Sequence, residues 1–239
     1  MTASRDGATA AIAAVVVGCA VAACAVRRPP VIAPPPVRTP LPTAIGAAHA
    51  LPEARSLAWV GATYYRHYCT ECHGEAGAGD GPGAGLLDPP PTDFTDRAYM
   101  RRQTPLWYYR SITDGVVGSS MAPWAPRLRP AERWDAAFYV WSMAVPDAVR
   151  SRGAAVYGQA CAACHGSDGR GVRAARLDDP RRVALSRDDA AAALARAHPD
   201  RVPRAAGDRD ALVEHLWTFL YAPVGAAADG APATPSPPR

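Results

Sequence analysis

Two stretches of the chain repeat the same pattern of two cysteines, a histidine and a glycine, C-x-x-C-H-G. The first runs from Cys69 to Gly74 and the second from Cys161 to Gly166. Thiols about one helical turn apart face the same way, so both can bond to the two vinyl groups of one porphyrin. The histidine that follows can then reach the iron as its proximal ligand. The pattern predicts two covalently bound c-type haems, held by Cys69, Cys72, His73, Cys161, Cys164 and His165.

Paired C-x-x-C motifs also occur in redox dithiols and in zinc sites, so a four-cysteine zinc site is the main alternative. Two features argue against it. The pairs lie 92 residues apart (161 minus 69), and each pair carries its own histidine and glycine. Two haem sites explain these additions, whereas a zinc site does not.

The rest of the composition limits what else the chain can be. Its 239 residues are enough for two small domains. All 26 basic residues are arginines and the formal net charge is +4, which the propionates of two haems would offset. The charge therefore gives no reason to expect nucleic-acid binding. Four of the six cysteines lie in the motifs and two in the N-terminal apolar stretch, so no pair remains for a structural disulfide.

Residues 1–24 resemble a bacterial export signal. Arg5 supplies a positive charge, and the apolar run from Ile12 to Val21 is too short to span a bilayer comfortably. Val21 to Cys24 is similar to a lipobox, so Cys24 is the expected lipidation site. The stretch ending at Cys19 fits the same pattern, and an ordinary signal peptide or an uncleaved anchor is a further alternative. Each version predicts an extracytoplasmic chain on the periplasmic side, and the preferred lipoprotein version also predicts that the chain is held at a membrane.

Proline content and an internal repeat divide the remainder of the chain. Residues 25–52 are a proline-rich tether, and residues 223–239 are a tail expected to be disordered. Residues 53–146 form one folded unit and residues 149–222 a second, shortened one. Gly61 and Tyr65 recur 92 residues later as Gly153 and Tyr157. The last helix recurs at an offset of about 76, so the second unit has lost about sixteen residues.

Helix-start signals and helical periodicity predict an all-α fold. Ser56 is a candidate N-cap for a helix that continues to Tyr68 and delivers the first motif. Further helices are expected at 105–112, 130–143 and 209–221, with a compact loop at 172–197. Four arginines of that loop are expected on the surface or near haem propionates: Arg173, Arg176, Arg181 and Arg182.

These motifs make residues 54–222 similar to a known family. In the first unit G-x-x-x-Y precedes the haem motif, and G-x-G-D-G, P-P-P-x-D-F, T-D-G-V-x-G, M-x-P-W and R-W-x-x-x-F-Y follow it. Both units resemble class I cytochrome c domains, and together they resemble a di-haem c-type cytochrome. The resemblance implies two tandem haem-wrapping helical domains in which the first and last helices cross. It also implies one-electron transfer, as in subunits of respiratory complexes.

The expected sixth iron ligands distinguish the two units. In the first, the resemblance assigns Met121, which lies 48 residues after His73 (121 minus 73), and a thioether raises the haem potential. No methionine follows His165 in the second unit. His198, which precedes a proline in a loop like that of Met121, is the preferred ligand there. His215 occupies a helix-packing position, and an open or water-bound iron is the remaining alternative.

The predicted function is electron transfer by an extracytoplasmic, membrane-tethered di-haem cytochrome c, with no catalytic residue of its own. Expected partners are a quinol-oxidising complex, a terminal oxidase or another membrane redox system. The alternative is a di-haem redox enzyme, peroxidase-like or thiosulfate-oxidising, that uses an open second haem. A structural subunit or sensor with a vestigial second haem is a further alternative.

Overall fold

The computed structural model describes residues 51–171 and 173–224. The predicted export signal, the lipidation site Cys24, nearly all of the proline-rich tether and most of the C-terminal tail lie outside these residues. The two haem motifs and all the predicted iron ligands lie within them.

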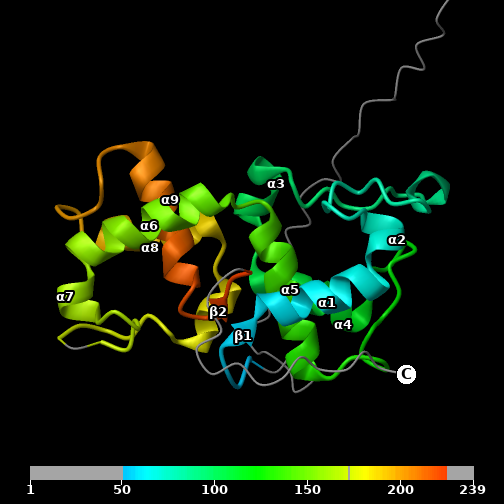
Figure 1. The fold of residues 1–239 in the computed structure, drawn as a ribbon, viewed down its shortest axis with the longest axis horizontal. Helices are drawn as coiled ribbons and strands as arrows, with labels where there is room; N and C mark the ends of the chain where they lie inside the picture. Colours follow the sequence, from blue (N-terminus) through cyan, green and yellow to red (C-terminus); the bar gives the residue numbers. More distant parts are fainter. Residues whose placement is uncertain (1–50, 172, 225–239) are drawn as a thin grey trace, which may run out of the picture. The chain divides into compact units, whose positions relative to one another are not determined.

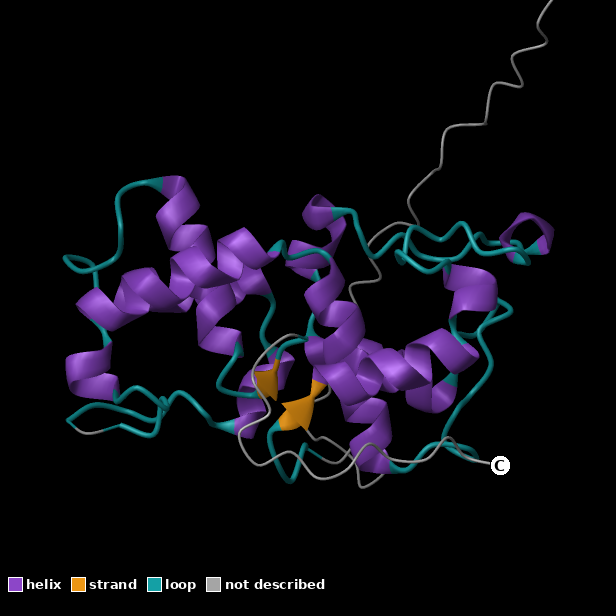
Figure 2. Ribbon diagram, viewed as in Figure 1, coloured by secondary structure: helices purple, strands orange, loops and turns teal. Residues whose placement is uncertain are grey.

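Helices make up nearly all the regular structure of the described chain, as predicted (Figures 1 and 2). A pair of two-residue strands is added, parallel, with Ser56 opposite Tyr221 and Leu57 opposite Ala222. No helix within the described ranges combines the length and the apolar character needed to cross a bilayer. In chain order the elements are β1 (Ser56–Leu57), α1 (Ala58–Tyr68), α2 (Thr70–His73), η2 (Ala84–Leu86), α3 (Arg97–Arg102), α4 (Pro105–Asp114), α5 (Pro130–Met143), α6 (Asp147–Ala160), α7 (Ala162–His165), η3 (Pro180–Ala184), α8 (Arg187–Ala197), α9 (Ala206–Trp217) and β2 (Tyr221–Ala222).

The same helix crossing occurs twice. In the first half of the described chain, α1 crosses α5 so closely that a Cβ on Gly61 would collide with the carbonyl of Asp135. In the second half, α6 crosses α9, and a Cβ on Gly153 would collide with the carbonyl of Ala211. The glycines are 92 residues apart (153 minus 61) and the carbonyls 76 (211 minus 135). The residues that pack at the two helix crossings are therefore separated by the same 92 and 76 residues that the repeat in the sequence predicts.

The start of α1 differs from the prediction. Ser56 does not cap the helix; it lies in β1, is buried, and its N–H donates to the Leu220 carbonyl at 3.0 Å. Leu57 occupies the N-cap position, and its N–H donates to the Asp135 carboxylate at 2.7 Å. A residue distant in sequence thus satisfies the helix end in place of a local serine.

The later helices follow the local signals more closely. Thr104 caps α4 through the Trp107 N–H, and α4 runs two residues beyond the predicted 105–112. Pro130 opens α5, which spans the predicted 130–143. In the second half α9 ends at Trp217, four residues short of the prediction, because the chain turns there into β2. The predicted loop 172–197 is wrong as a loop: η3 and α8 occupy much of it, and Ser186 caps α8.

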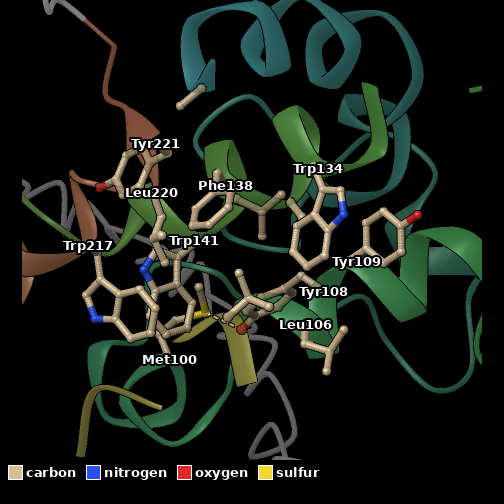
Figure 3. Close-up of a cluster of buried hydrophobic side chains, with 14 of the residues drawn as sticks. Met100, Leu106, Tyr108, Tyr109, Trp134, Phe138, Trp141, Trp217, Leu220 and Tyr221 are labelled. Carbon is tan, nitrogen blue, oxygen red and sulfur yellow. Dashed lines mark hydrogen bonds between the residues drawn. The ribbon is translucent and has the colours of Figure 1, made fainter. Parts of the chain in front are cut away.

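One buried cluster includes aromatic side chains from both halves (Figure 3). Trp141 of α5 meets Trp217 of α9 with ring centroids 5.2 Å apart, and the two lie at the same place in the repeat (217 minus 141 is 76). Both indoles are fully buried, so their apolar surface is removed from water at this contact.

A buried ion pair lies beside these tryptophans. Arg187, at the start of α8, contacts Glu214 of α9 with 2.6 Å between Nε and Oε1, and both side chains are almost inaccessible. The same guanidinium donates to the Trp141 carbonyl at 2.9 Å and lies 3.7 Å from the centre of the Trp141 ring. Removing one member of a buried pair typically costs about 3–5 kcal/mol, because the other charge is left uncompensated. Arg187 therefore ties α8 and α9 to α5.

Candidate metal centres

The first motif begins where α1 ends. Cys69 is the last residue held by α1, its N–H donating to the Tyr65 carbonyl at 2.9 Å, and Cys72 and His73 follow in the single turn α2. Cys69 and Cys72 are both free thiols. Burial, and then the neighbouring Cys72, raise the pKa of the Cys69 thiol to about 12, so it carries its proton at neutral pH.

The imidazole of His73 is held on two sides. Its Nδ1 lies 3.4 Å from the Thr92 carbonyl, and its ring stacks on Phe94 with centroids 4.7 Å apart and planes 22° apart. Phe94 is itself held by an N–H bond to the Gly77 carbonyl at 2.7 Å. Burial lowers the pKa of His73, which favours a neutral ring. With Nδ1 bound to a carbonyl, Nε2 is left as the donor for a metal.

The second motif repeats this arrangement with different side chains. His165 Nδ1 lies 2.9 Å from the Ala175 carbonyl, and the residue two further on, Leu177, donates its N–H to the Gly169 carbonyl at 2.6 Å. Leu177 therefore takes the place of Phe94, and an aliphatic side chain replaces the aromatic ring. Cys161 and Cys164 are free thiols on either side of the α7 start.

A buried tyrosine anchors each motif. Tyr65 donates its hydroxyl to the Gly74 carbonyl at 2.7 Å, and Tyr157 donates to the Gly166 carbonyl at 2.6 Å. Both glycines have a positive φ, 75° and 77°, which favours glycine over a residue with a side chain. The tyrosines thus fix the sharp turn that follows each histidine.

Met121 lies in a loop packed against the end of α1. The Met121 carbonyl accepts the Val116 N–H at 3.0 Å, and the Met121 N–H donates to the Ser119 hydroxyl at 3.1 Å. Both hydrogen bonds therefore use the main chain of Met121. Three residues later, Trp124 packs on Tyr68, the residue before the first motif, with centroids 5.1 Å apart. The loop and the motif are therefore brought into the same neighbourhood.

His198 lies directly beside His165. It forms the C-cap of α8, and the two ring centroids are 5.8 Å apart with perpendicular planes. His215 is instead part of the α6–α9 crossing, where its ring packs on Tyr157 at 4.9 Å and on Phe219 at 5.3 Å. The structure thus brings one of the two candidate histidines together with the second motif and places the other in helix packing.

Met100, Met143 and His67 make contacts with neighbouring side chains or loops of the first half. Met100 is fully buried and its sulfur accepts the Tyr108 hydroxyl at 2.7 Å. A Cβ on Gly77 would lie 2.6 Å from the Met143 sulfur, so Met143 packs over the loop that follows the first motif. His67 is exposed and contacts Tyr68.

Three of the four arginines singled out in the second half, Arg176, Arg181 and Arg182, have side-chain partners within the protein, and Arg173 is exposed. Arg176 contacts Asp178 with 2.6 Å between Nη2 and Oδ2, and Arg181 contacts Asp179. Arg182 is half-buried, donates to the Leu177 and Leu216 carbonyls, and lies 5.3 Å over the Trp217 ring. Burial lowers its pKa to about 10, which still leaves it charged at neutral pH. Arg182 is therefore part of the core packing.

The donor sets fit c-type haem. Each motif offers two free thiols on one turn and an imidazole whose Nδ1 is engaged by a carbonyl, which leaves Nε2 for iron. A four-cysteine zinc site is not formed: within the described residues, no three His, Cys, Asp or Glu side chains gather as a metal ion would need.

Two family models match the chain, one over each motif. The model described as cytochrome c oxidase, cbb3-type, subunit III matches residues 58–140, and the model described as cytochrome c matches residues 151–218. The chain is a di-haem class I c-type cytochrome. Its two tandem cytochrome c domains imply two covalently bound c-type haems, as the motifs predicted.

This di-haem cytochrome is similar to a curated protein, the cbb3-type cytochrome c oxidase subunit FixP of Sinorhizobium medicae (strain WSM419). The two are 33% identical over 118 residues, which is 47% of this chain and 40% of the relative. The matched part of the cytochrome thus spans well under two thirds of that relative.

Solved structures give a weaker likeness. A chain of the Kuenenia stuttgartiensis reducing HAO-like protein complex Kustc0457/Kustc0458 aligns with a TM-score of 0.33 and 18% identity, over 72% of this chain and 99% of that one. The KustC0563 c-type cytochrome aligns with a TM-score of 0.31 and 24% identity, over 35% and 95%.

Sequence reasoning missed the groups that orient the two proximal histidines. Phe94 lies in the P-P-P-x-D-F motif, but the motif does not show that its ring stacks on His73. The Thr92 and Ala175 carbonyls belong to the main chain and leave no signal in the residue types. The paired indoles Trp141 and Trp217 were also missed, although their 76-residue offset is visible in the sequence. A search of the final helices for identical residues at that offset finds them.

Proposed function

We propose that this cytochrome transfers single electrons between membrane redox partners on the extracytoplasmic side, with a terminal oxidase system as the acceptor. The tandem domains support electron transfer, and the similarity to FixP, a cbb3-type cytochrome c oxidase subunit, supports the oxidase system. The haem iron supplies the one-electron chemistry, cycling between its ferrous and ferric forms. The chain supplies ligands, burial and geometry.

In the proposed first domain, within residues 53–146, Cys69 and Cys72 attach the haem. His73 is the proximal ligand and Met121 the distal one. The contact of Trp124 with Tyr68 supports this assignment, because it holds the loop that carries Met121 close to the motif. A thioether ligand favours ferrous iron and raises the potential.

In the proposed second domain, within residues 149–222, Cys161 and Cys164 attach the haem, and His165 and His198 are its axial ligands. The observation that carries this assignment is the 5.8 Å between the two imidazole centroids. At this distance both imidazoles could contribute a nitrogen to the same haem iron, so His165 and His198 would hold that iron together.

The two ligand sets give the proposed transfer a direction. A His/His haem has a lower potential than a His/Met haem in comparable surroundings. Electrons should therefore enter through the second domain and leave through the first. In this scheme the residues of the chain would hold both haems and supply a side chain to each remaining iron position.

The di-haem enzyme remains the competing hypothesis, and it needs an open second iron for peroxide or thiosulfate chemistry. The position of His198 beside His165 argues against that opening. Carbon monoxide binding separates the two functions, because an open ferrous iron binds it and a bis-histidine iron resists it.

The decisive experiment is the haem content and absorption spectrum of the wild-type protein beside His198→Ala and Met121→Ala. Two low-spin haems are expected in the wild type. Replacing His198 should make the second haem high-spin and open to carbon monoxide, and replacing Met121 should do so for the first. His215→Ala is the matched control, since it removes a histidine of the same half that packs on Tyr157. An unchanged low-spin signal in His198→Ala would contradict the assignment.

The membrane tether is tested separately. In the proposed scheme acylated Cys24 anchors the chain, and residues 25–52 hold the haem domains away from the membrane. Cys24→Ser should move the cytochrome from the membrane fraction to the soluble periplasmic fraction, while Cys19→Ser should leave it at the membrane. The reverse result would assign the anchor to Cys19, and retention of the double variant would exclude lipidation as the anchor.

A further inference from the structure

Four buried aromatic side chains form a series that starts at the first proximal histidine. The ring of His73 stacks on Phe94 at 4.7 Å, and Phe94 meets Tyr108 edge to face at 5.9 Å. Tyr108 is 6.4 Å from Trp141, and Trp141 is 5.2 Å from Trp217. These are ring-centroid distances, so each side chain is in contact with the next. We call Phe94, Tyr108, Trp141 and Trp217 the aromatic series.

The aromatic series passes from one half of the protein to the other. Its first three members belong to the first half, and Trp217 belongs to α9 of the second (Figure 3). All four side chains are buried, so successive rings contact one another inside the core and away from solvent. Trp141 and Trp217 are equivalent positions of the repeat, and at this pair a ring of each half contacts a ring of the other.

Arg182 continues the series toward the second motif. Its guanidinium lies 5.3 Å over the Trp217 ring and donates to the Leu177 carbonyl. Leu177 is two residues from Ala175, whose carbonyl is 2.9 Å from His165 Nδ1. A route of ring contacts and hydrogen bonds therefore joins His73 to His165. Along this route the electron would follow the main chain only in the short segment 175–177.

Two features set the tryptophan pair apart from ordinary core packing. A buried tryptophan usually finds a partner for its N–H, but in the described structure neither Trp141 Nε1 nor Trp217 Nε1 has a hydrogen-bond partner. The pair is also held rigidly, because Arg187 donates to the Trp141 carbonyl, covers its ring and pairs with Glu214. Hydrogen bonding does not explain the choice of indole at these positions, whereas extended π systems in contact do couple redox centres better than aliphatic side chains.

We propose that the aromatic series, with Trp141 and Trp217 at its centre, is the route by which an electron passes between the two haems. In each event one electron leaves the haem attached at Cys161 and Cys164 and arrives at the haem attached at Cys69 and Cys72. One iron is oxidised as the other is reduced, and no proton or further reactant takes part. The rings act as the medium through which the electron tunnels and are not themselves oxidised. This inference rests on the proposed function.

The test measures electron equilibration between the haems of the fully loaded chain after pulsed reduction by a small-molecule radical. Trp141→Leu and Trp217→Leu should each slow equilibration several-fold, since a saturated side chain replaces the ring. Trp141→Phe keeps a ring and should retain most of the rate. The matched control is Trp134→Leu, which removes an equally buried indole that stacks on Tyr109 outside the series.

Potentiometric titration of both haems and their low-spin spectra accompany every rate. Slower equilibration in Trp141→Leu with both potentials unchanged supports the route. The wild-type rate in that variant, or an equal slowing in Trp134→Leu, overturns it. If Trp141→Leu or Trp134→Leu fails to incorporate haem, Trp141→Met against Trp134→Met decides, because methionine also replaces the ring by a saturated side chain. Equal rates in these two variants overturn the route. Failure of the proposed function looks different, because the wild type itself would then lack two low-spin haems.

Discussion

The two halves of the cytochrome share a frame and differ in what is attached to it. The frame consists of a glycine at the helix crossing, a tyrosine that holds the turn after the motif, and a carbonyl that contacts the histidine of the motif. The differences lie around the proposed sixth ligands, where the first half has the Met121 loop and the second has α8 with His198 at its end. The surroundings of the motif histidines are therefore the constant part, and in the proposed scheme the sixth ligands give the halves unequal potentials.

The two halves also differ in the side chains of their last helices, α5 and α9. Tyr139 packs on Tyr65 in the first half, and His215 packs on Tyr157 in the second, again 76 residues apart. Met143 covers Gly77, and Phe219 covers Gly169 in the same way. The repeat thus preserves positions and volumes more strictly than residue types, as expected for a close-packed core.

The crossing glycines give the largest expected effect. Gly61→Leu should unfold the first half and Gly153→Leu the second, because each side chain would collide with the main chain of the partner helix. Losses above about 4 kcal/mol are expected for such overpacking against a main chain. Haem content should fall to one per chain in each variant, measured as haem per protein by pyridine haemochrome. Gly158→Leu is the control, since the space around a Cβ there is open. Two haems in Gly61→Leu would show that the halves do not depend on this crossing.

Exchanging the distal ligands should bring the halves closer together in potential. Met121→His should lower the potential of the first haem, and His198→Met should raise that of the second, since thioether ligation favours ferrous iron. Each shift should be a sizeable part of the roughly 0.8 V that axial ligands span. Spectropotentiometric titration resolves the two haems. If His198→Met leaves both midpoints in place, His198 is not a ligand.

The turn-holding tyrosines should have a smaller and symmetrical effect. Tyr65→Phe and Tyr157→Phe each remove one hydroxyl that donates to a glycine carbonyl, at 2.7 Å and 2.6 Å. The expected cost is about 1–3 kcal/mol of unfolding free energy, because a carbonyl inside the fold loses its partner. Denaturant unfolding followed by fluorescence measures it. Unequal costs would show that one half tolerates water at this carbonyl.

The smallest expected effect is a pH dependence of opposite sign in the two halves. Burial, opposed by the Leu57 N–H bond and aided by Glu132, raises the pKa of Asp135 to about 7. A carboxyl group with a raised folded-state pKa contributes stability below its unfolded pKa of about 4, and this stability is lost as pH rises toward 7. Asp135→Asn should remove that decline, and Ala211 takes the equivalent position in the second half.

In the second half burial lowers the pKa of His215 instead. A histidine with a lowered folded-state pKa stabilises the fold above its unfolded pKa of about 6.5, and the stability falls as pH falls through that value. His215→Leu should flatten this acid-side slope. Unfolding free energies measured from pH 4 to 8 compare the two variants, and slopes of the same sign in both halves would contradict the assignment.

The sequence predicted most of the fold because its signals are local or periodic. Thr104 and the prolines at 105 and 130 start helices within one turn of themselves, and the predicted helix 130–143 matches α5. The prediction was wrong where a distant residue intervened. Ser56 lost the cap of α1 because Asp135 accepts the Leu57 N–H, and the end of α9 was set by strand pairing with β1. The loop at 172–197 was missed as helix because its alanine-rich pattern carries little periodicity.

By itself, the sequence determined that the chain carries two covalently bound c-type haems, because C-x-x-C-H-G places two thiols and an imidazole within about one turn, so residue types and spacing were enough. The 92- and 76-residue offsets likewise determined that the fold is duplicated and that its second copy is shorter. The sequence favoured His198 over His215 from its loop position, but only the tertiary structure shows that His198 lies beside His165, because folding brings the end of α8 to the second motif. The tertiary structure alone also decided that Trp141 and Trp217 meet, since a contact between residues 76 apart depends on how helices pack.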